Sequence, residues 1–235
     1  MPLKTRLLEE IALAGHEHLD PAYVAVYDQK ARIDPSDDLA DLRERGLSAD
    51  STLVDLGAGT GTFALAAASL CKRVIAVDVS PAMVAAMQAK VAECGVTNVE
   101  CVQAGFLSYE HTGAPAGFIY TRNALHHLPD FWKAIALRRL ADLLRPGGVL
   151  RLRDLVFAFE LREAESFISR WLETGAERAE DGWTRDELEV HLRDEHSTFN
   201  WLLEPMIEQA GFEIERAEYG RVRVYADYIC TRRGR

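Results

Sequence analysis

The sequence predicts an α/β fold: a mostly parallel sheet with helices on both faces, closed by an antiparallel hairpin. Between residues 52 and 155, short apolar segments alternate with longer helix-forming segments. A glycine-rich turn at 57–61 joins the first strand to its helix. Two further strands, 212–219 and 223–231, flank Gly220 near the end of the chain. Alternating strands and helices of this size fold as parallel sheets, whereas strands joined by a short turn pair as hairpins.

The composition is that of one globular domain with a full core and a small cap. The chain has 235 residues, 48% of them hydrophobic, and a net charge of −10. No apolar run approaches the roughly 20 residues that a membrane span needs. Acidic residues at positions 9 and 10 come too early for a signal peptide. We therefore expect a cytoplasmic protein without a membrane partner, and its acidic surface disfavours a nucleic acid substrate.

The first 48 residues predict helices and no strand. Apolar residues recur at helical spacing in 3–14, 22–32 and 39–45. Asp20-Pro21 is a typical capped start for the second of these helices. His16-Glu17-His18 precedes it and is expected in a polar loop, because no other metal-ligating residues gather near it in the sequence.

The central repeat supplies the predicted parallel strands. Strands and helices are expected in alternation at 52–56, 61–70, 73–78, 81–94 and 97–103. Ligands of such sheets bind beyond the carboxyl ends of the strands. Asp55, Asp78 and Gln103 are expected at that edge of the sheet.

The second half of the chain completes the sheet and adds a cap. A fourth strand at 116–122, a helix beginning at Pro129-Asp130 and a fifth strand at 149–155 continue the alternation, with a tight turn at 145–148. Residues from about 156 to 205 are charged and less regular. We expect them to form a helical insertion over the mouth of the active site.

The glycine-rich turn and two carboxylates indicate an adenosyl ligand. Gly57, Gly59 and Gly61 leave room for a ligand against the backbone, and the next helix aims unpaired N–H groups at the turn. Asp55 would repel a pyrophosphate but would attract an ammonium group. Asp78 follows about 20 residues later, where a carboxylate accepts hydrogen bonds from ribose hydroxyls. This pair fits S-adenosylmethionine better than NAD.

Four segments resemble the class I S-adenosylmethionine-dependent methyltransferases, of the small-molecule, UbiE/YcgJ-like type. They are Asp-Leu-Gly-Ala-Gly-Thr-Gly at 55–61 and the segments 74–83, 123–130 and 144–150, which together span roughly residues 50–155. The resemblance implies a Rossmann-like, seven-stranded sheet with an antiparallel last strand, and S-adenosyl-L-methionine as cofactor. It further implies an N-terminal helical lid at 1–48 and a methyltransferase domain at 49–235.

The residues and the resemblance together assign the site. Expected cofactor contacts are Tyr27, Asp55, Gly57, Ala58, Gly59, Gly61, Asp78, Val79, Met83, Gln103, Ala104, Gly105, Phe106 and Asn123. Expected catalytic groups are His126, His127 and His196, and expected substrate contacts are Tyr23, Arg122, Phe199 and Trp201. Gly105 departs from the family, whose members often carry an acidic residue there for the adenine amino group. Phe118 stands where relatives have Asp, and no metal site is expected.

The acceptor is expected to be a small apolar or aromatic molecule, methylated on oxygen, nitrogen or carbon. Two other functions stay open. One is a non-catalytic S-adenosylmethionine-binding module that regulates or assembles a complex. The other is an NAD(P)-dependent oxidoreductase: residues 59–64 match G-x-G-x-x-A, but no Tyr-x-x-x-Lys pair accompanies them. The sequence also leaves a homodimer open.

Overall fold

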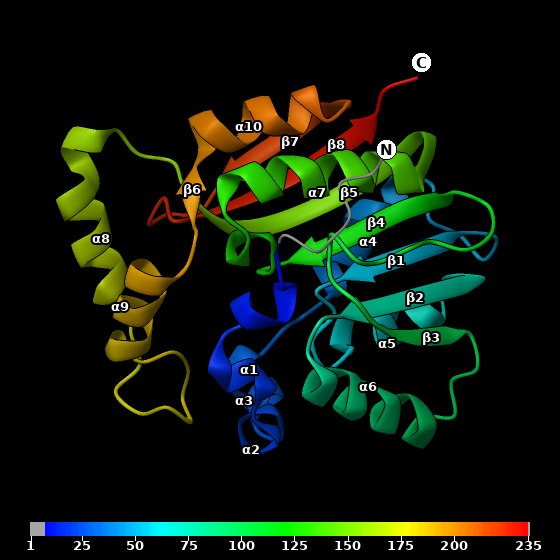
Figure 1. Cartoon of the computed structure of the whole chain (residues 1–235), viewed down its shortest axis with the longest axis horizontal. Coiled ribbons are helices and arrows are strands. Elements are labelled where there is room, and N and C mark those ends of the chain that lie inside the picture. Colours follow the sequence, from blue (N-terminus) through cyan, green and yellow to red (C-terminus); the bar gives the residue numbers. More distant parts are fainter. Residues whose placement is uncertain (1–7, 235) are drawn as a thin grey trace.

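The computed structural model describes residues 8–234, and an eight-stranded sheet is its centre (Figure 1). The strand order is β3-β2-β1-β4-β5-β8-β7, with β6 paired to β5 beside this path. β1 to β5 are parallel to their neighbours, while β8 is antiparallel to β5 and β7. The strands are β1 Thr52–Leu56, β2 Arg73–Asp78, β3 Val99–Gln103, β4 Ala116–Arg122, β5 Leu144–Phe157, β6 Thr198–Phe199, β7 Phe212–Tyr219 and β8 Tyr225–Arg232. The predicted Rossmann-like sheet is confirmed, and β6 is an addition to it.

Helices cover both faces of the sheet (Figure 1). One face packs against α7 and α10, whose Leu137 and Ile207 are fully buried in the core. The other face packs against α4, α5 and α6, whose Leu42 and Met87 are equally buried. The bounds are α4 Ser36–Glu44, α5 Thr62–Ala68, α6 Pro81–Glu93, α7 Asp130–Leu143 and α10 Asn200–Gln209. Burying each such side chain contributes roughly 1.5–3 kcal/mol, so the two cores hold the strand ends in fixed register.

The N-terminal segment is a series of single helical turns. They are η2 Glu10–Leu13, α1 His16–Leu19, α2 Pro21–Val24 and α3 Tyr27–Ala31. The predicted helix 3–14 begins outside the described residues, and the expected loop at His16–His18 is instead helical. The predicted helix 22–32 is broken because Val26 leaves the helical conformation, with φ −109° and ψ 0°. Gly15, at φ +79°, separates the first two turns.

The segment that follows β5, called here the α8–α9 insertion, consists mainly of these two helices and lies beside the carboxyl end of β5 (Figure 1). Trp171 and Leu188 from these helices pack with Leu155 and Phe157 of β5 in a separate small core. The elements of the insertion are η4 Leu161–Glu163, α8 Ala164–Leu172 and α9 Arg185–Asp194, whereas a further short turn, η3 Leu125–His127, joins β4 to α7. The capping box at the start of α9 is present, because Thr184 and Glu187 each accept the other's backbone N–H.

The expected turn at 145–148 is absorbed into β5 as a bulge. Ala116 pairs with Leu144 and Phe118 with Val149, so the four residues 145–148 lie opposite Gly117 alone. Gly147 takes φ +72°, a conformation that glycine adopts without strain.

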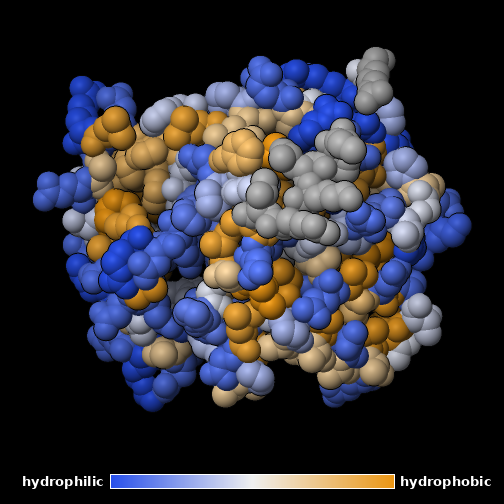
Figure 2. All heavy atoms as spheres, viewed as in Figure 1, coloured by the Kyte–Doolittle hydropathy of each residue, from blue (hydrophilic) through white to orange (hydrophobic). Residues whose placement is uncertain are grey.

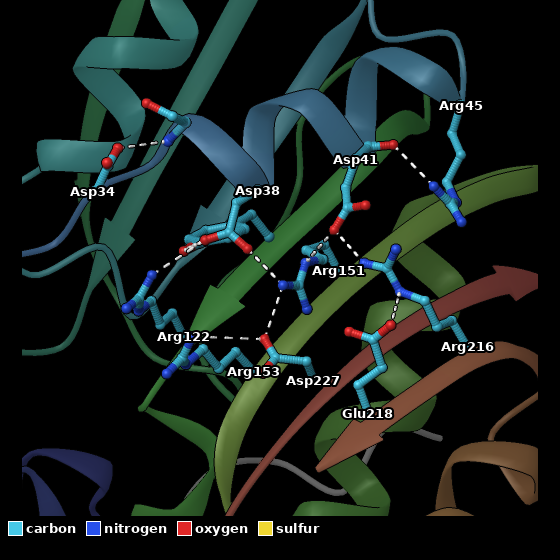
Figure 3. Close-up of polar contacts among 12 residues, drawn as sticks. Asp34, Asp38, Asp41, Arg45, Arg122, Arg151, Arg153, Arg216, Glu218 and Asp227 are labelled. Carbon is cyan, nitrogen blue, oxygen red and sulfur yellow. Dashed lines mark hydrogen bonds and ion pairs between the residues drawn. The ribbon is translucent and has the colours of Figure 1, made fainter. Parts of the chain in front are cut away.

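A network of charges joins α4 to the sheet (Figure 3). Arg151 of β5 is buried and its Nη2 lies 2.7 Å from Asp38 Oδ1 and 2.8 Å from Asp227 Oδ1. Arg216 of β7 contacts Asp41. Arg122, at the end of β4, reaches Asp38 Oδ2 at 3.2 Å. These pairs fix α4 over the strands that end at the site.

Candidate functional site

A first cavity lies beyond the carboxyl ends of β1, β2 and β4, and we call it the cofactor cavity. Its walls come from the glycine-rich turn, the strand ends and the N-terminal turns. They are Glu10, Ala14, His18, Tyr27, Gly57, Gly59, Asp78, Val79, Met83, Ala104, Gly105, Phe106, Arg122, Asn123, Ala124, His127 and Leu128. A Cβ on Gly57 would lie 2.3 Å from the Cβ of Ala124, so only glycine fits there.

Asp78 is held in place by the turn itself. Its Oδ2 accepts a hydrogen bond from the Gly59 N–H at 2.8 Å, and its Oδ1 accepts one from the Ser80 N–H at 2.9 Å. Burial raises the pKa of this carboxyl, while the hydrogen bonds from Ser80 and Gly59 oppose the rise. The carboxylate therefore stands at the end of β2 on the wall of the cofactor cavity.

Asp55 has the chemistry expected of a group awaiting a cationic partner. It is 1% exposed, and among residues 8–234 its Oδ2 meets no hydrogen-bond partner. Burial, and then the Asp78 carboxylate, raise the pKa of Asp55 well above its usual range. It lines a small pocket behind the turn with Gly57, Ala58 and Gly59. An ammonium group there would satisfy the orphaned oxygen, so the residues present fit S-adenosylmethionine.

Four residues expected at the cofactor do not line the cofactor cavity: Asp55 and Ala58 line the small pocket instead, whereas Gly61 and Gln103 line neither. Gly61 lies against α6: a Cβ on it would be 2.7 Å from Met87 Cγ, so its small size serves packing. Gln103 is exposed at the end of β3, an edge strand. Both positions suit a cofactor role by spacing alone, which does not tell a ligand-facing residue from a packing one.

Glu10 is a cofactor-cavity residue that the sequence did not indicate. A Cβ on Gly105 would lie 2.3 Å from Glu10 Oε1, so the Glu10 carboxylate occupies the space of a side chain at 105. Its Oε1 accepts from the Leu107 N–H at 3.0 Å, and its Oε2 accepts from the Ser108 hydroxyl at 2.9 Å. Position 105 carries no acidic side chain, but the carboxylate of Glu10 in η2, almost a hundred positions earlier in the chain, lies in its place.

A second cavity, of about 250 Å³, opens between the N-terminal turns and the α8–α9 insertion. We call it the acceptor cavity, and Figure 2 shows a hollow between these two parts. It shares His18, Tyr27, Asn123 and His127 with the cofactor cavity. Its other walls are Glu17, Tyr23, His126, Leu155, Trp171, Trp183, Glu187, Leu188, Val190, His191, Glu195 and Tyr225. Asn123 adopts φ +49°, a strained conformation that recurs at functional sites.

The two adjacent histidines have opposite surroundings. His126 is buried between two carboxylates: its Nδ1 contacts Asp154, and its Nε2 lies 2.8 Å from Glu195 Oε2. Burial opposes charging of the ring, but Asp154 and then Glu195 raise the pKa of His126 to about 9. Burial and the neighbouring His126 hold the pKa of His127 well below its usual range. His127 is therefore neutral at pH 7, and its Nδ1 has no hydrogen-bond partner in the described part of the chain.

Glu195 is the shared carboxylate of this cluster. Its Oε2 also lies 2.7 Å from His191 Nδ1 and 3.8 Å from His127 Nδ1. Burial alone would raise its pKa, but the close contacts with the His126 and His191 rings hold that pKa well below the usual value. No sequence pattern indicated a site role for Glu195 or His191, because both lie in a charged helical stretch far from residues 126–127.

Other predicted residues lie elsewhere. His196 contributes its backbone, whose N–H donates to the His126 carbonyl at 3.1 Å. Phe199 stacks on Trp201, and Trp201 is 53% exposed in a separate groove. The cause is β6, whose pairing of Phe199 with Phe157 carries this segment away from the acceptor cavity. Arg122 lines the cofactor cavity and pairs with Asp38, so it does not face the acceptor.

Comparisons with known proteins define the class. Residues 53–148 match the family described as "Methyltransferase domain". The chain is 28% identical over 170 residues to an uncharacterized methyltransferase, GK2543, of Geobacillus kaustophilus, covering 72% of this chain and 73% of that one. It is 32% identical over 155 residues to the ubiquinone biosynthesis O-methyltransferase of Xanthomonas euvesicatoria, covering 62% of each. An S-adenosylmethionine-dependent methyltransferase from Clostridium acetobutylicum shares the fold, with a TM-score of 0.67 at 13% identity over 91% of this chain and 98% of that one.

Residues 53–148 therefore carry a methyltransferase domain, and the strand order of the sheet is that of the class I S-adenosylmethionine-dependent methyltransferases. The methyl donor of this domain is S-adenosyl-L-methionine. Within residues 8–234 the structure has no helix long and apolar enough to cross a membrane.

Proposed function

We propose that this methyltransferase acts on a small aromatic molecule bound in the acceptor cavity. The observation that carries the proposal is the wall shared by the two cavities, made of His18, Tyr27, Asn123 and His127. A molecule in the acceptor cavity lies directly against the residues that line the cofactor cavity. Tyr23, Trp171, Trp183 and Tyr225 add aromatic surface, which favours a flat, aromatic acceptor.

The acceptor atom we propose is a protic oxygen or nitrogen. When bound, S-adenosylmethionine supplies a methyl group on a positive sulfur, and the acceptor exchanges one proton for it. The protein's part is to position the acceptor and exclude water. His127 and Glu195 face the acceptor cavity, so the imidazole–carboxylate cluster is placed to take the proton. The Xanthomonas relative is named an O-methyltransferase, which agrees with an oxygen acceptor.

The cofactor contacts follow from the chemistry of the cavity wall. We propose that Asp55 binds the amino group, Asp78 the ribose hydroxyls, and Gly57 and Gly59 the methionine portion. Glu10, beside Gly105, would accept a hydrogen bond from the adenine amino group. The supporting observations are the orphaned oxygen of Asp55, the fixed carboxylate of Asp78, and the Glu10 carboxylate in the space of a side chain at 105.

Calorimetric titration with S-adenosylmethionine, S-adenosylhomocysteine and NADH tests the cofactor, and a screen of phenols and aromatic amines tests the acceptor. We expect micromolar binding of the two adenosyl ligands, no binding of NADH, and methylation of a phenol. Binding of NADH alone would point to an oxidoreductase. Tight adenosyl binding without transfer to any acceptor would favour the regulatory module.

The remaining expectations on partners and location are also proposals. The net charge of −10 supports a protein that does not bind nucleic acid. We propose a cytoplasmic location and leave a homodimer as the assembly state to be tested by sedimentation. A monomer at micromolar concentration would contradict the homodimer.

A further inference from the structure

Imidazoles and a carboxylate converge at the inner end of the acceptor cavity. One ligand atom from each of His126, His127 and Glu195 can be chosen so that all lie within 4.8 Å of one another. His191 lies outside this group of three but contacts it, because its Nδ1 is 2.7 Å from Glu195 Oε2. These residues come from η3 and from α9 with the residue that follows it, so helices on two sides of the cavity supply the ligand atoms.

Two of the rings that face Glu195, those of His126 and His191, are each oriented by a second contact on the other nitrogen. Asp154 contacts Nδ1 of His126 and also accepts from the His126 backbone N–H at 3.0 Å. Ser197 Oγ lies 2.8 Å from Nε2 of His191. His126 Nε2 and His191 Nδ1 are therefore the ring nitrogens that face Glu195. Holding the outer nitrogen of a histidine by a carboxylate or hydroxyl is how proteins fix metal-ligating imidazoles.

The charges of the cluster also call for a cation. Asp154 and Glu195 bring two carboxylates into a mostly buried space, with side chains 2% and 18% exposed. His126 Nε2 and Glu195 Oε2 face each other at 2.8 Å, so they share a proton in the metal-free protein, and a divalent ion would displace that proton. A divalent ion bound by neutral imidazoles would balance both carboxylates.

We propose that His126, His127, His191 and Glu195 bind a divalent transition-metal ion at the inner end of the acceptor cavity. Imidazole and carboxylate ligands suit Zn²⁺ and its first-row neighbours, whereas Mg²⁺ and Ca²⁺ prefer oxygen alone. Bonds of about 2.0–2.1 Å in a tetrahedral site place ligand atoms about 3.3 Å apart. The 2.7 and 2.8 Å contacts of Glu195 must therefore open by about half an ångström.

The sequence predicts no metal site, and this proposal replaces that prediction. The side chain of His127 lines both cavities, so the ion would lie close to the wall between them. A heteroatom of the acceptor would then displace His127 from the ion, and the freed imidazole would take the acceptor's proton. The proposal does not depend on the identity of the acceptor, because metal binding is measured without methyl transfer.

The test uses the full chain, stripped with a chelator and titrated with Zn²⁺ by calorimetry and with Co²⁺ by visible absorption. We expect one ion per chain and the strong d–d bands of tetrahedral Co²⁺. Glu195→Gln and His191→Gln should each weaken Zn²⁺ binding at least 10-fold, and Asp154→Asn about 10- to 100-fold. His111→Gln, whose ring bonds to Tyr109 and the Ala114 carbonyl away from the cluster, is the control and should bind as the parent does.

Three outcomes would overturn the proposal: no binding of either ion, equal affinity in the parent and both ligand variants, or Co²⁺ bands of an octahedral site unaffected by the substitutions. Because Glu195→Gln removes a partner of several rings, circular dichroism is measured on each variant. His191→Gln carries the test if Glu195→Gln fails to fold. If the protein binds the metal but methylates no acceptor, the metal site is supported and the proposed reaction is contradicted.

Discussion

Glu10 and Gly105 form one composite position. A Cβ on Gly105 would lie 2.3 Å from the carboxylate oxygen of Glu10, so a side chain at 105 and the Glu10 carboxylate exclude each other. The carboxylate is anchored by Leu107 and Ser108. An acidic group is therefore available beside the end of the third strand even though position 105 itself carries none.

Glu10→Gln should reduce discrimination between adenine and hypoxanthine ligands. The carboxylate accepts from an amino group but repels the 6-oxo group, and a hydrogen bond to a charged group is worth about 1.5–3 kcal/mol. We expect S-adenosylhomocysteine to bind about 10-fold more weakly, while S-inosylhomocysteine binds more tightly because the repulsion is removed. Calorimetry with both ligands measures the ratio. Glu9→Gln, at the exposed neighbouring position, is the control, and an unchanged ratio in Glu10→Gln would contradict the assignment.

Asp78→Ala should weaken binding of S-adenosylmethionine by about 1–3 kcal/mol, because the ribose hydroxyls lose a buried acceptor. The substitution also frees the N–H groups of Gly59 and Ser80. Asp50→Ala, at an exposed turn, serves as the matched control. Unchanged affinity in a folded Asp78→Ala protein would remove Asp78 from the cofactor site.

Gly61→Ala should lower stability more than Gly147→Ala. Both glycines have positive φ, +83° and +72°, so both substitutions add backbone strain of about 1–3 kcal/mol. Only Gly61 has a neighbour in the way, Met87 Cγ at 2.7 Å, whereas no described atom lies within 4 Å of a Cβ at 147. Thermal unfolding of the two variants measures the difference. Equal losses of stability in the two variants would mean that the Met87 side chain of α6 moves away from residue 61 without an energetic cost.

Folding stability should fall in acid through the Lys30–Glu187 pair. Lys30 is buried and bonds to Glu187 at the start of α9. Burial raises the pKa of Glu187, but hydrogen bonds from Lys30 and Thr184 lower it below its ordinary value of 4.5. A depressed carboxyl pKa stabilises the fold above the unfolded value and loses that contribution as pH falls through the folded one.

Denaturant unfolding of the parent and Glu187→Gln at several pH values tests this pair. We expect the variant to be less stable at pH 7, because Lys30 keeps its buried charge without a partner. Its stability should also change less than the parent's below pH 4.5. Parallel curves for the two proteins would show that Glu187 does not contribute to the pH dependence. Glu189→Gln, on the same helix and paired at the surface with Arg185, is the control.

The sheet and the glycine-rich turn were predictable because local patterns determine them. Alternation of strands and helices marks β1 to β5, and Asp78 follows from its distance to the turn. The cluster around Glu195 was not predictable, since its members come from 126–127 and 191–195 and meet only when α9 docks. Likewise, the placement of Phe199 depends on its pairing with Phe157. That pairing is a long-range contact, and no spacing within the segment encodes it.

The wall shared by the two cavities makes the two ligands thermodynamically linked. His18 and Tyr27 contribute to both cavities and both come from the short N-terminal turns. A ligand that orders these turns lowers the entropy cost that the second ligand must meet. Linkage is reciprocal, so a product that still occupies one cavity raises the affinity of the other cavity for its ligand. The turnover rate of the enzyme would then be governed by how readily this small stretch of chain opens.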